Sequence, residues 1–255
     1  MEDARFMTSL ARGLEVLAAF EAQSRLTVTQ AAKQTGLSRS AAGRCLFTLE
    51  QLGYVAAEGT SYSLCPSVLP LARGFTAGNR LVRAGQDVVD DLRDRLGESS
   101  SLATFDTRSF YRQVIYVCRA ETTRIISVPL FTGAVLPSYC TSNGRVLLAG
   151  LAPEALSAFL EASAFPARTI KTLINPDALQ AELEKIRVQG WAMTDGELEA
   201  GLRSIAVPVR DIGGKVVAAI NLATQSAHRT QDWLLQTALP ELQAAAAHLA
   251  RTAFT

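Results

Sequence analysis

The stretch that decides the fold of this chain is Ser38-Arg39-Ser40-Ala41-Ala42-Gly43-Arg44-Cys45-Leu46-Phe47-Thr48-Leu49. Ser38 is a good helix N-cap, and the residues after it follow helical spacing. The inward side is expected to carry Leu37, Ala42, Cys45, Leu46, Leu49 and Leu52, and the outward side Arg39, Ser40, Gly43, Arg44 and Thr48. Just upstream, Thr27 is expected to cap a short helix that ends at Gly36. Two helices across a tight glycine turn, the second carrying arginines, predict a helix-turn-helix that presents its outward side to the DNA major groove.

Two features of this helix have a second interpretation. Arginines on an amphipathic helix are often simply solvated, and here it is the helix-turn-helix spacing that favours DNA contact. Gly43 costs about 1 kcal/mol relative to alanine inside a helix. It either lets the helix approach a base edge closely or is merely tolerated, and the sequence leaves both explanations open.

The segments around these helices complete a winged domain. Ser9 is expected to cap a first helix over 9–20, and two short strands at 54–56 and 62–64 flank a turn at 58–61. The turn contains no basic residue, so phosphate contacts from this wing are assigned to Thr60, Ser61 and main-chain amides. The apolar residues of 66–79 indicate a connecting helix rather than a flexible linker. We therefore expect a DNA-binding domain over 1–65, a linker helix over 66–79 and an effector-binding and oligomerisation domain over 80–255.

Composition limits the other possibilities. A chain of 255 residues with 48% apolar residues is long enough for two domains. Its net charge of +1 is too small for non-specific binding of nucleic acid through overall positive charge, so DNA affinity must come from a local patch. The four cysteines lack C-x-x-C spacing and the chain has only two histidines, which argues against a metal site, and no other cofactor is indicated. We see no signal peptide and no apolar stretch of membrane-spanning length, so a reduced, cytoplasmic protein is expected.

The second half mixes strands and helices. Strands are expected at 101–105, 113–119, 125–130 and 191–193, and helices at 82–96, 144–150, 153–161, 176–189 and 233–253. Gly213-Gly214 indicates a two-residue hairpin loop, which pairs Ala206 with Asn221 and Ser204 with Ala223. One face of this hairpin is then apolar, with Ile205, Val207, Val209, Ala218, Ile220 and Leu222. The other face is small or polar, with Ser204, Ala206, Pro208, Ala219, Asn221 and Ala223.

The small face suggests a binding pocket. A buried Asn221 needs a polar partner, which is either protein backbone or water, or else a small molecule lying on this face. The segment Thr141-Ser142-Asn143-Gly144-Arg145 opens a helix, and free amides at a helix start favour a carboxylate. Thr141 or Ser142 can also simply cap the helix, and the two roles are compatible. The carboxylates Asp195, Glu197 and Glu199 do not indicate catalysis, because no nucleophile or metal site accompanies them.

Several separated motifs together resemble IclR-type transcriptional regulators. They are residues 9–17, the helix-turn-helix, residues 141–149 and residues 199–209, in the same order. The resemblance spans nearly the whole chain, and within the family the chain is most similar to the branch that controls aromatic-acid breakdown through protocatechuate and β-ketoadipate. It implies an α+β protein with an N-terminal winged helix-turn-helix, a linker helix and a C-terminal GAF-like effector domain, whose curved antiparallel sheet is flanked by helices. It also implies dimers made through the DNA-binding domains and commonly paired into tetramers.

The resemblance also implies an effector pocket at Ile125, Val128, Leu136, Ser142, Asn143, Asp195, Ser204, Asn221 and Ala223. Ser142, Ser204, Asn221 and Ala223 follow independently from the strand faces and the helix start. Together these observations predict a non-enzymatic regulator whose binding to a palindromic operator is controlled by a small carboxylic acid with an aromatic body. This chain has Asn221 and Ala223 where other members can carry hydroxyl residues, and Ser204 where some carry cysteine, so the ligands best known in the family do not carry over to it directly.

Two other classes make different predictions. A thiol-based redox sensor would use Cys140 or Cys45, and it requires a thiol of lowered pKa and loss of DNA binding on mild oxidation. An enzyme would need a nucleophile paired with a base, and the sequence shows no such pair.

Overall fold

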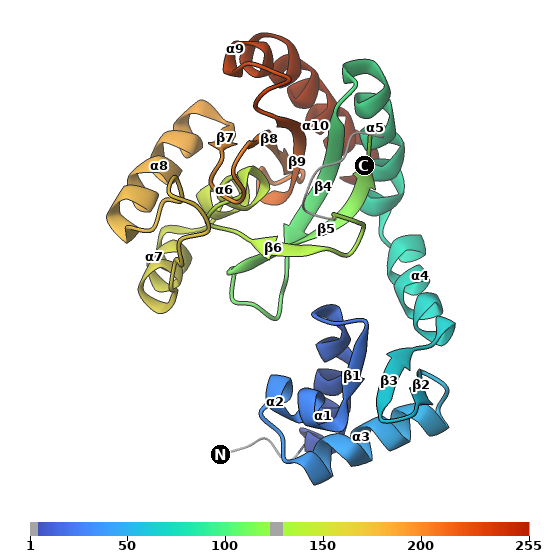
Figure 1. Ribbon diagram of the computed structural model, residues 1–255. Coiled ribbons are helices and arrows are strands. Elements are labelled where there is room, and N and C mark those ends of the chain that lie inside the picture. Colours follow the sequence, from blue (N-terminus) through green and yellow to red (C-terminus); the bar gives the residue numbers. More distant parts are fainter. Residues whose placement is uncertain (1–4, 123–129, 255) are drawn as a thin grey trace. The chain divides into compact units, whose positions relative to one another are not determined.

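The computed structural model describes residues 5–122 and 130–254, and its chain divides into two compact units, Met1–Gly78 and Asn79–Thr255 (Figure 1). Each unit has its own hydrophobic core. No helix in these described ranges is long and apolar enough to cross a membrane. The same ranges contain no group of three or more His, Cys, Asp or Glu side chains arranged to hold a metal ion.

The N-terminal unit is a helix-turn-helix with a three-stranded sheet. Its elements are α1 (Thr8–Ala18), a 3-10 turn (Ala19–Glu21), β1 (Arg25–Thr27), α2 (Val28–Thr35), α3 (Arg39–Gln51), β2 (Val55–Glu58), β3 (Ser61–Leu64), a second 3-10 turn (Pro66–Val68) and α4 (Leu69–Gly78). Thr27 caps α2 in a reciprocal capping box with Gln30, and Gly36 ends that helix with left-handed backbone. Ser38 caps α3 by accepting a hydrogen bond of 3.2 Å from the Ala41 amide. These local interactions confirm the predicted pair of helices and their turn.

Two predictions for this unit are wrong, and one strand was not predicted. The first helix begins at Thr8, after an extended Met7 whose side chain makes no cap, and not after Ser9. Leu52 is 64% exposed instead of buried, because α3 ends at Gln51 and Leu52 lies beyond the helix. Strand β1 was not predicted, since three residues are too short to show an alternating pattern. It pairs antiparallel with β3.

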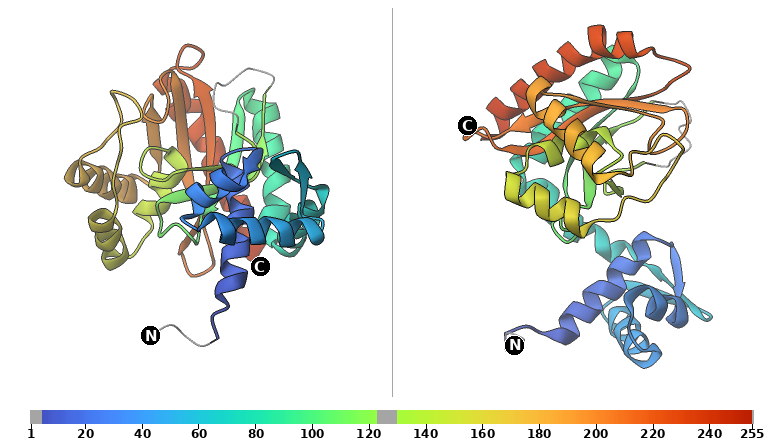
Figure 2. Two further views of the ribbon diagram at one scale, coloured as in Figure 1. Left: turned by 60° about the horizontal axis from the view of Figure 1, so that its bottom comes forward. Right: turned by 90° about the vertical axis from the view of Figure 1, so that its left-hand side faces the viewer.

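The C-terminal unit is an antiparallel sheet between two layers of helices. Its elements are α5 (Arg80–Leu96), β4 (Ser99–Phe105), β5 (Gln113–Ala120), β6 (Val135–Pro137), α6 (Ser142–Ala149), α7 (Pro153–Ala162), α8 (Pro176–Gln189), β7 (Ala192–Asp195), β8 (Leu202–Arg210), β9 (Val216–Gln225), α9 (Gln231–Trp233), a π-helical turn (Leu234–Ala238) and α10 (Leu239–Phe254). The six strands lie in the order β6-β5-β4-β9-β8-β7. Helices α5 and α10 cover one face, and α6, α7 and α8 lie on the other (Figure 2). The predicted strand over 125–130 falls almost entirely outside the described residues.

The hairpin of β8 and β9 has the predicted register but a different loop. Ala206 pairs with Asn221 and Ser204 with Ala223, and the apolar face packs against α5 and α10. The loop, however, is a turn closed by the Gly214 amide on the Asp211 carbonyl, with Gly214 at a φ of 81°. A bulge after Val209 compensates for the extra loop residue. The predicted two-residue loop is therefore wrong, while the pairs derived from it are correct.

Candidate DNA-binding and effector sites

The outer side of α3 presents two free cations. Arg39, Ser40, Arg44 and Thr48 are all exposed. The Thr48 hydroxyl donates 2.9 Å to the Arg44 carbonyl. Neither guanidinium has a carboxylate partner within residues 5–122 and 130–254. An unpaired arginine on an exposed helix face is available to base edges or phosphates.

Gly43 faces the other helix of the motif instead of solvent. It is half-buried, and a Cβ built there would lie 3.6 Å from Cγ1 of Val28 on α2. The position is therefore at the contact between α2 and α3, which differs from its predicted outward orientation. This geometry favours a packing role and gives no support to a close approach to a base edge.

Arg25 lies at the wing, where the sequence pattern did not predict a cation. Arg25 on β1 makes an ion pair of 2.6 Å with Glu58 at the end of β2. The turn between β2 and β3 exposes Thr60, and the Ser61 hydroxyl donates 3.1 Å to the Glu58 carbonyl. Arg25 is distant from the wing in sequence, and only the pairing of β1 with β3 brings it there. The acidic charge at the wing is thus balanced by a neighbouring guanidinium.

In the C-terminal unit, polar side chains form a row across three strands on the face toward α6. Arg119 on β5 pairs in register with Ser101 on β4, which pairs in turn with Asn221 on β9. The Arg119 side chain is only 4% exposed. Its Nη1 donates 2.9 Å to Ser101 Oγ, and its Nε donates 2.8 Å to Oε1 of Glu121. A buried guanidinium therefore lies two strands from Asn221, with Ser101 between them.

A β-bulge places Arg119 on this face. Cys118 pairs with Leu102 and Tyr116 pairs with Ala103, which leaves Val117 as an extra residue in β5. Strict alternation would send Tyr116 and Arg119 to opposite faces, but the extra residue turns both toward the same cavity. No signal in the sequence marks this bulge, so the role of Arg119 could not be predicted.

The row borders a small cavity of about 20 Å³, enough for roughly one water molecule. Its walls are Tyr116, Arg119, Leu130, Leu136, Cys140, Thr141, Thr194, Leu198, Leu202, Ser204, Asn221 and Ala223. The residues on either side of Asn221 in the neighbouring strands, Ser101 and Ala206, have small side chains and leave space above this part of the sheet.

Two buried amides in this region lack hydrogen-bond partners. Oδ1 of Asn221, and both Oδ1 and Nδ2 of Asn143, are buried without a partner in the described structure. Asn143 lies at the start of α6 near Tyr116, and burial raises the pKa of Tyr116 to about 12. Buried polar atoms in native proteins are nearly always paired, so unpaired ones indicate a ligand or solvent site.

Hydroxyl groups connect the sheet to α6. Thr194 and Ser204 lie 3.0 Å apart across β7 and β8, and the Ser204 hydroxyl donates 2.8 Å to Ser142 Oγ at the start of α6. Thr141 caps this helix by accepting 3.2 Å from the Gly144 amide. The chain of hydroxyls fixes the helix start against the small face of the hairpin.

The predicted pocket residues fall into four groups. Leu136, Ser204, Asn221 and Ala223 line the cavity, while Ser142 and Asn143 lie directly behind it. Ile125 and Val128 lie outside the described residues. Asp195 does not line the cavity, because its neighbour Thr194 faces that side and consecutive strand residues point to opposite faces.

Asp195 instead makes an ion pair on the far side of the sheet. Its Oδ2 accepts 2.8 Å from Arg203 and 3.2 Å from Gln231. The hydrogen bond from Arg203 is the main reason why the pKa of Asp195 is lowered. The structure thus places Thr194, and not Asp195, on the wall of the cavity.

The cysteines do not match a redox sensor. Cys140 is fully buried, and burial raises the pKa of its thiol to about 11. Burial also raises the pKa of Cys118, to about 12. A thiol with a raised pKa contains little reactive thiolate at neutral pH. Cys140 thus has the opposite property from the one that the redox interpretation requires, and that interpretation is not supported.

A winged helix-turn-helix with two unpaired arginines on its second helix places the protein in the class of DNA-binding transcription regulators. The family model for the IclR helix-turn-helix domain matches residues 9–59, and that for the bacterial transcriptional regulator IclR C-terminal domain matches residues 76–251. The chain therefore belongs to the IclR family of transcriptional regulators.

Two relatives and one solved structure are similar to the chain over most of its length. The chain is 42% identical to the Pca regulon regulatory protein of Pseudomonas putida, covering 99% of this chain and 86% of that one. It is 30% identical to the p-hydroxybenzoate hydroxylase transcriptional activator of Acinetobacter baylyi, covering 93% and 89%. It shares its fold with an IclR homologue from Microbacterium hydrocarbonoxydans crystallised with 4-hydroxybenzoate, at a TM-score of 0.79 and 23% identity, covering 96% and 98%. These relatives are regulators of transcription and not enzymes.

Proposed function

We propose that this regulator binds a palindromic operator as a homodimer or a pair of dimers, and that a small aromatic carboxylic acid controls its DNA binding from the cavity beneath α6. The observation that carries the effector proposal is the buried Arg119 guanidinium in register with Asn221, whose amide oxygen has no partner in the part of the chain that the structure describes.

The chemistry of the cavity matches the two ends of such a ligand. A guanidinium binds a carboxylate with paired, charge-assisted hydrogen bonds, and burial strengthens them. Leu136, Leu198 and Leu202 supply apolar walls for a flat ring. Asn221 can accept a hydrogen bond from a ring hydroxyl. The relatives that act on p-hydroxybenzoate hydroxylase genes or bind 4-hydroxybenzoate support an acid of this type.

The size of the cavity suggests how binding could be transmitted. About 20 Å³ cannot contain an aromatic ring, so the ligand has to displace wall side chains to enter. A ligand that requires an expanded cavity favours the expanded conformation over the compact one. This differential affinity is what any effector needs in order to change the affinity of a distant DNA site.

Calorimetry with matched ligands tests the effector proposal. We expect 4-hydroxybenzoate and 3,4-dihydroxybenzoate to bind the full chain and phenol to bind at least tenfold more weakly, because phenol lacks the carboxylate that Arg119 would hold. The acids should also change operator affinity in an anisotropy titration. Equal binding of phenol, or no binding of any acid in the series, would contradict the proposal.

For the DNA interface, we propose that Arg39, Ser40, Arg44 and Thr48 contact the major groove and that Thr60 and Ser61 contact phosphates. Ser38 contributes as the cap of the helix that presents them. The unpaired guanidiniums of α3 support this assignment, and the balanced charge at the wing limits its share of the affinity.

Exposed apolar residues support the proposed dimer. On α1, Leu10 and Leu14 are exposed, and Val16 is the one buried residue. On α4, Leu69, Leu71 and Phe75 are exposed, and no residue of this helix is buried. A helix with an apolar face and nothing against it in its own unit needs a partner surface.

We predict that Leu14→Glu together with Phe75→Glu converts the dimer into a monomer, because it places charges in the proposed contact. Sedimentation velocity over a range of concentrations measures this. Ile212→Glu, which changes an exposed apolar residue on the β8–β9 loop, should leave the dimer intact. If the wild-type chain is a monomer at every concentration, with and without DNA, the dimer proposal is wrong.

A further inference from the structure

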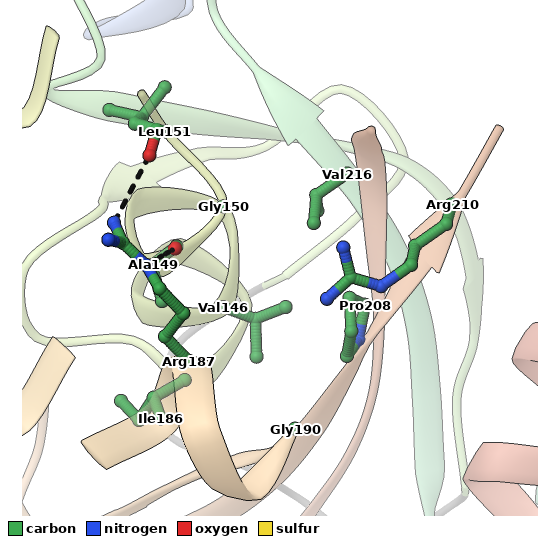
Figure 3. A pocket seen from close by; sticks show the side chains of 10 residues that line it. All are labelled: Val146, Ala149, Gly150, Leu151, Ile186, Arg187, Gly190, Pro208, Arg210 and Val216. Carbon is green, nitrogen blue, oxygen red and sulfur yellow. Dashed lines mark hydrogen bonds between the residues drawn. The ribbon is translucent and has the colours of Figure 1, made fainter. Parts of the chain in front are cut away.

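A second pocket lies in the C-terminal unit, at the opposite end of α6 from the effector cavity. It has a volume of about 300 Å³, at the lower end of the range for small-molecule sites. Figure 3 shows its apolar side chains Val146 of α6, Ile186 of α8, Pro208 of β8 and Val216 of β9. It shares no lining residue with the effector cavity. It is therefore a separate site.

The first polar group of this pocket is Arg187 of α8. Its Nε donates 2.9 Å to the Ala149 carbonyl, and its Nη2 donates 3.1 Å to the Leu151 carbonyl (Figure 3). The C-terminal end of a helix has a partial negative charge that repels anions. Arg187 neutralises that charge by binding the carbonyls, and its Nη1 makes no hydrogen bond with the described residues.

The second polar group is Arg210 at the end of β8. Its Nη1 donates 2.8 Å to the Gly214 carbonyl of the neighbouring loop, which holds the side chain in place. In Figure 3 the guanidinium extends over Pro208 and Val216 toward the pocket. Arg210 thus adds a second positive charge to a pocket with an apolar base.

Neither guanidinium is neutralised by a carboxylate. Within the described ranges, Arg187 and Arg210 make no ion pair, whereas Arg93, Arg95, Arg145 and Arg203 each do. The lining contains no acidic residue. Two cations over an apolar base, without an acidic partner, form a site of positive potential that matches an anionic ligand.

The base of this pocket is also closely packed. A Cβ built on Gly150, just after α6, would lie 2.6 Å from Val216, so the backbone at that point touches the β8–β9 hairpin directly. The arginines therefore project from α8 and β8 around a fixed contact between α6 and the sheet. The hydrogen bonds from Arg187 to the Ala149 and Leu151 carbonyls, and from Arg210 to the Gly214 carbonyl, orient the two cations before any ligand arrives.

We propose that this pocket is a second ligand site that takes a small dicarboxylate, with one carboxylate at each guanidinium and the connecting methylene groups over Val146, Ile186 and Val216. The proposal does not depend on the effector cavity or on the acid assigned to it. It gives the regulator a second ligand, which binds at the C-terminal end of α6, whereas the effector cavity lies at the N-terminal end of that helix.

Calorimetry of the full chain with dicarboxylates and monocarboxylates of equal length tests the site. We expect glutarate or adipate to bind with one site per chain, and pentanoate and hexanoate to bind at least tenfold more weakly, since each can engage one guanidinium only. If neither dicarboxylate binds, or if a monocarboxylate binds as tightly as its dicarboxylate, the proposal is overturned.

Substitutions then locate the binding. Arg210→Gln should weaken dicarboxylate binding tenfold or more, and its exposed position leaves the fold intact, as circular dichroism can verify. Lys185→Gln removes an exposed cation from the same helix as Arg187 and should have no effect. Asn221→Leu alters the effector cavity and should leave dicarboxylate affinity unchanged. Unchanged binding in Arg210→Gln, or loss of binding in Asn221→Leu, would show that the dicarboxylate binds elsewhere.

Discussion

Replacing Arg44 by alanine is expected to weaken operator binding by about 1–3 kcal/mol, which is roughly five- to 150-fold. Arg44 projects from the exposed side of α3 and has no ion-pair partner in the described residues of the chain. It lies outside the core of the N-terminal unit, which contains Ala42, Leu46 and Leu49 of the same helix. The substitution therefore removes a DNA contact without removing a packing contact.

Fluorescence anisotropy with operator DNA at several salt concentrations separates the two kinds of contact. If Arg44 binds a base, the loss should be largest on the operator and small on unrelated DNA, whereas a phosphate contact should also reduce the salt dependence by about one ion. Lys185→Ala, in the C-terminal unit, controls for loss of one positive charge. Operator binding by Arg44→Ala at wild-type strength would show that α3 is not the recognition helix.

Replacing Asn221 by leucine is expected to abolish the response of DNA binding to the acid while basal operator binding persists. Asn221 is 3% exposed, and its unpaired Oδ1 is in the region that the ligand would occupy. Leucine fills the space beside Ser101 and Ala206 with an apolar group and removes the polar contact. Coupling between effector and DNA sites typically amounts to about 1–3 kcal/mol, so a roughly five- to 150-fold shift in operator affinity should disappear.

The measurement is operator affinity with and without saturating acid, together with calorimetry of the acid itself. Thr224→Val is the matched control, because Thr224 is a buried residue of the same strand whose side chain points to the opposite face. It should keep the response. If the acid binds Asn221→Leu with wild-type affinity, the pocket lies elsewhere and the small face of the hairpin serves only for packing.

The features that the sequence determined by itself are those fixed by neighbours along the chain. Thr27, Gly36 and Ser38 set the ends of the two helices through hydrogen bonds and backbone conformations that span three or four residues. The register of β8 against β9 was also predictable, because a shift by one residue would exchange its apolar and small faces. The bulge after Val209 offsets the extra loop residue, so the pairs from Val209–Ala218 to the far end of the hairpin are as predicted, whereas Arg210 pairs with Val216.

Tertiary structure decided which residues meet at the sites. The extra residue at Val117 turns Arg119 into the cavity, and the pairing of β1 with β3 brings Arg25 to the wing. Thr194, and not its neighbour Asp195, lines the cavity because of the way the edge strand β7 is turned toward α6. The second pocket joins α6, α8, β8 and β9, which are separated by many residues. Each of these placements depends on packing between distant segments and on local irregularities in a strand, and neither leaves a periodic pattern in the sequence.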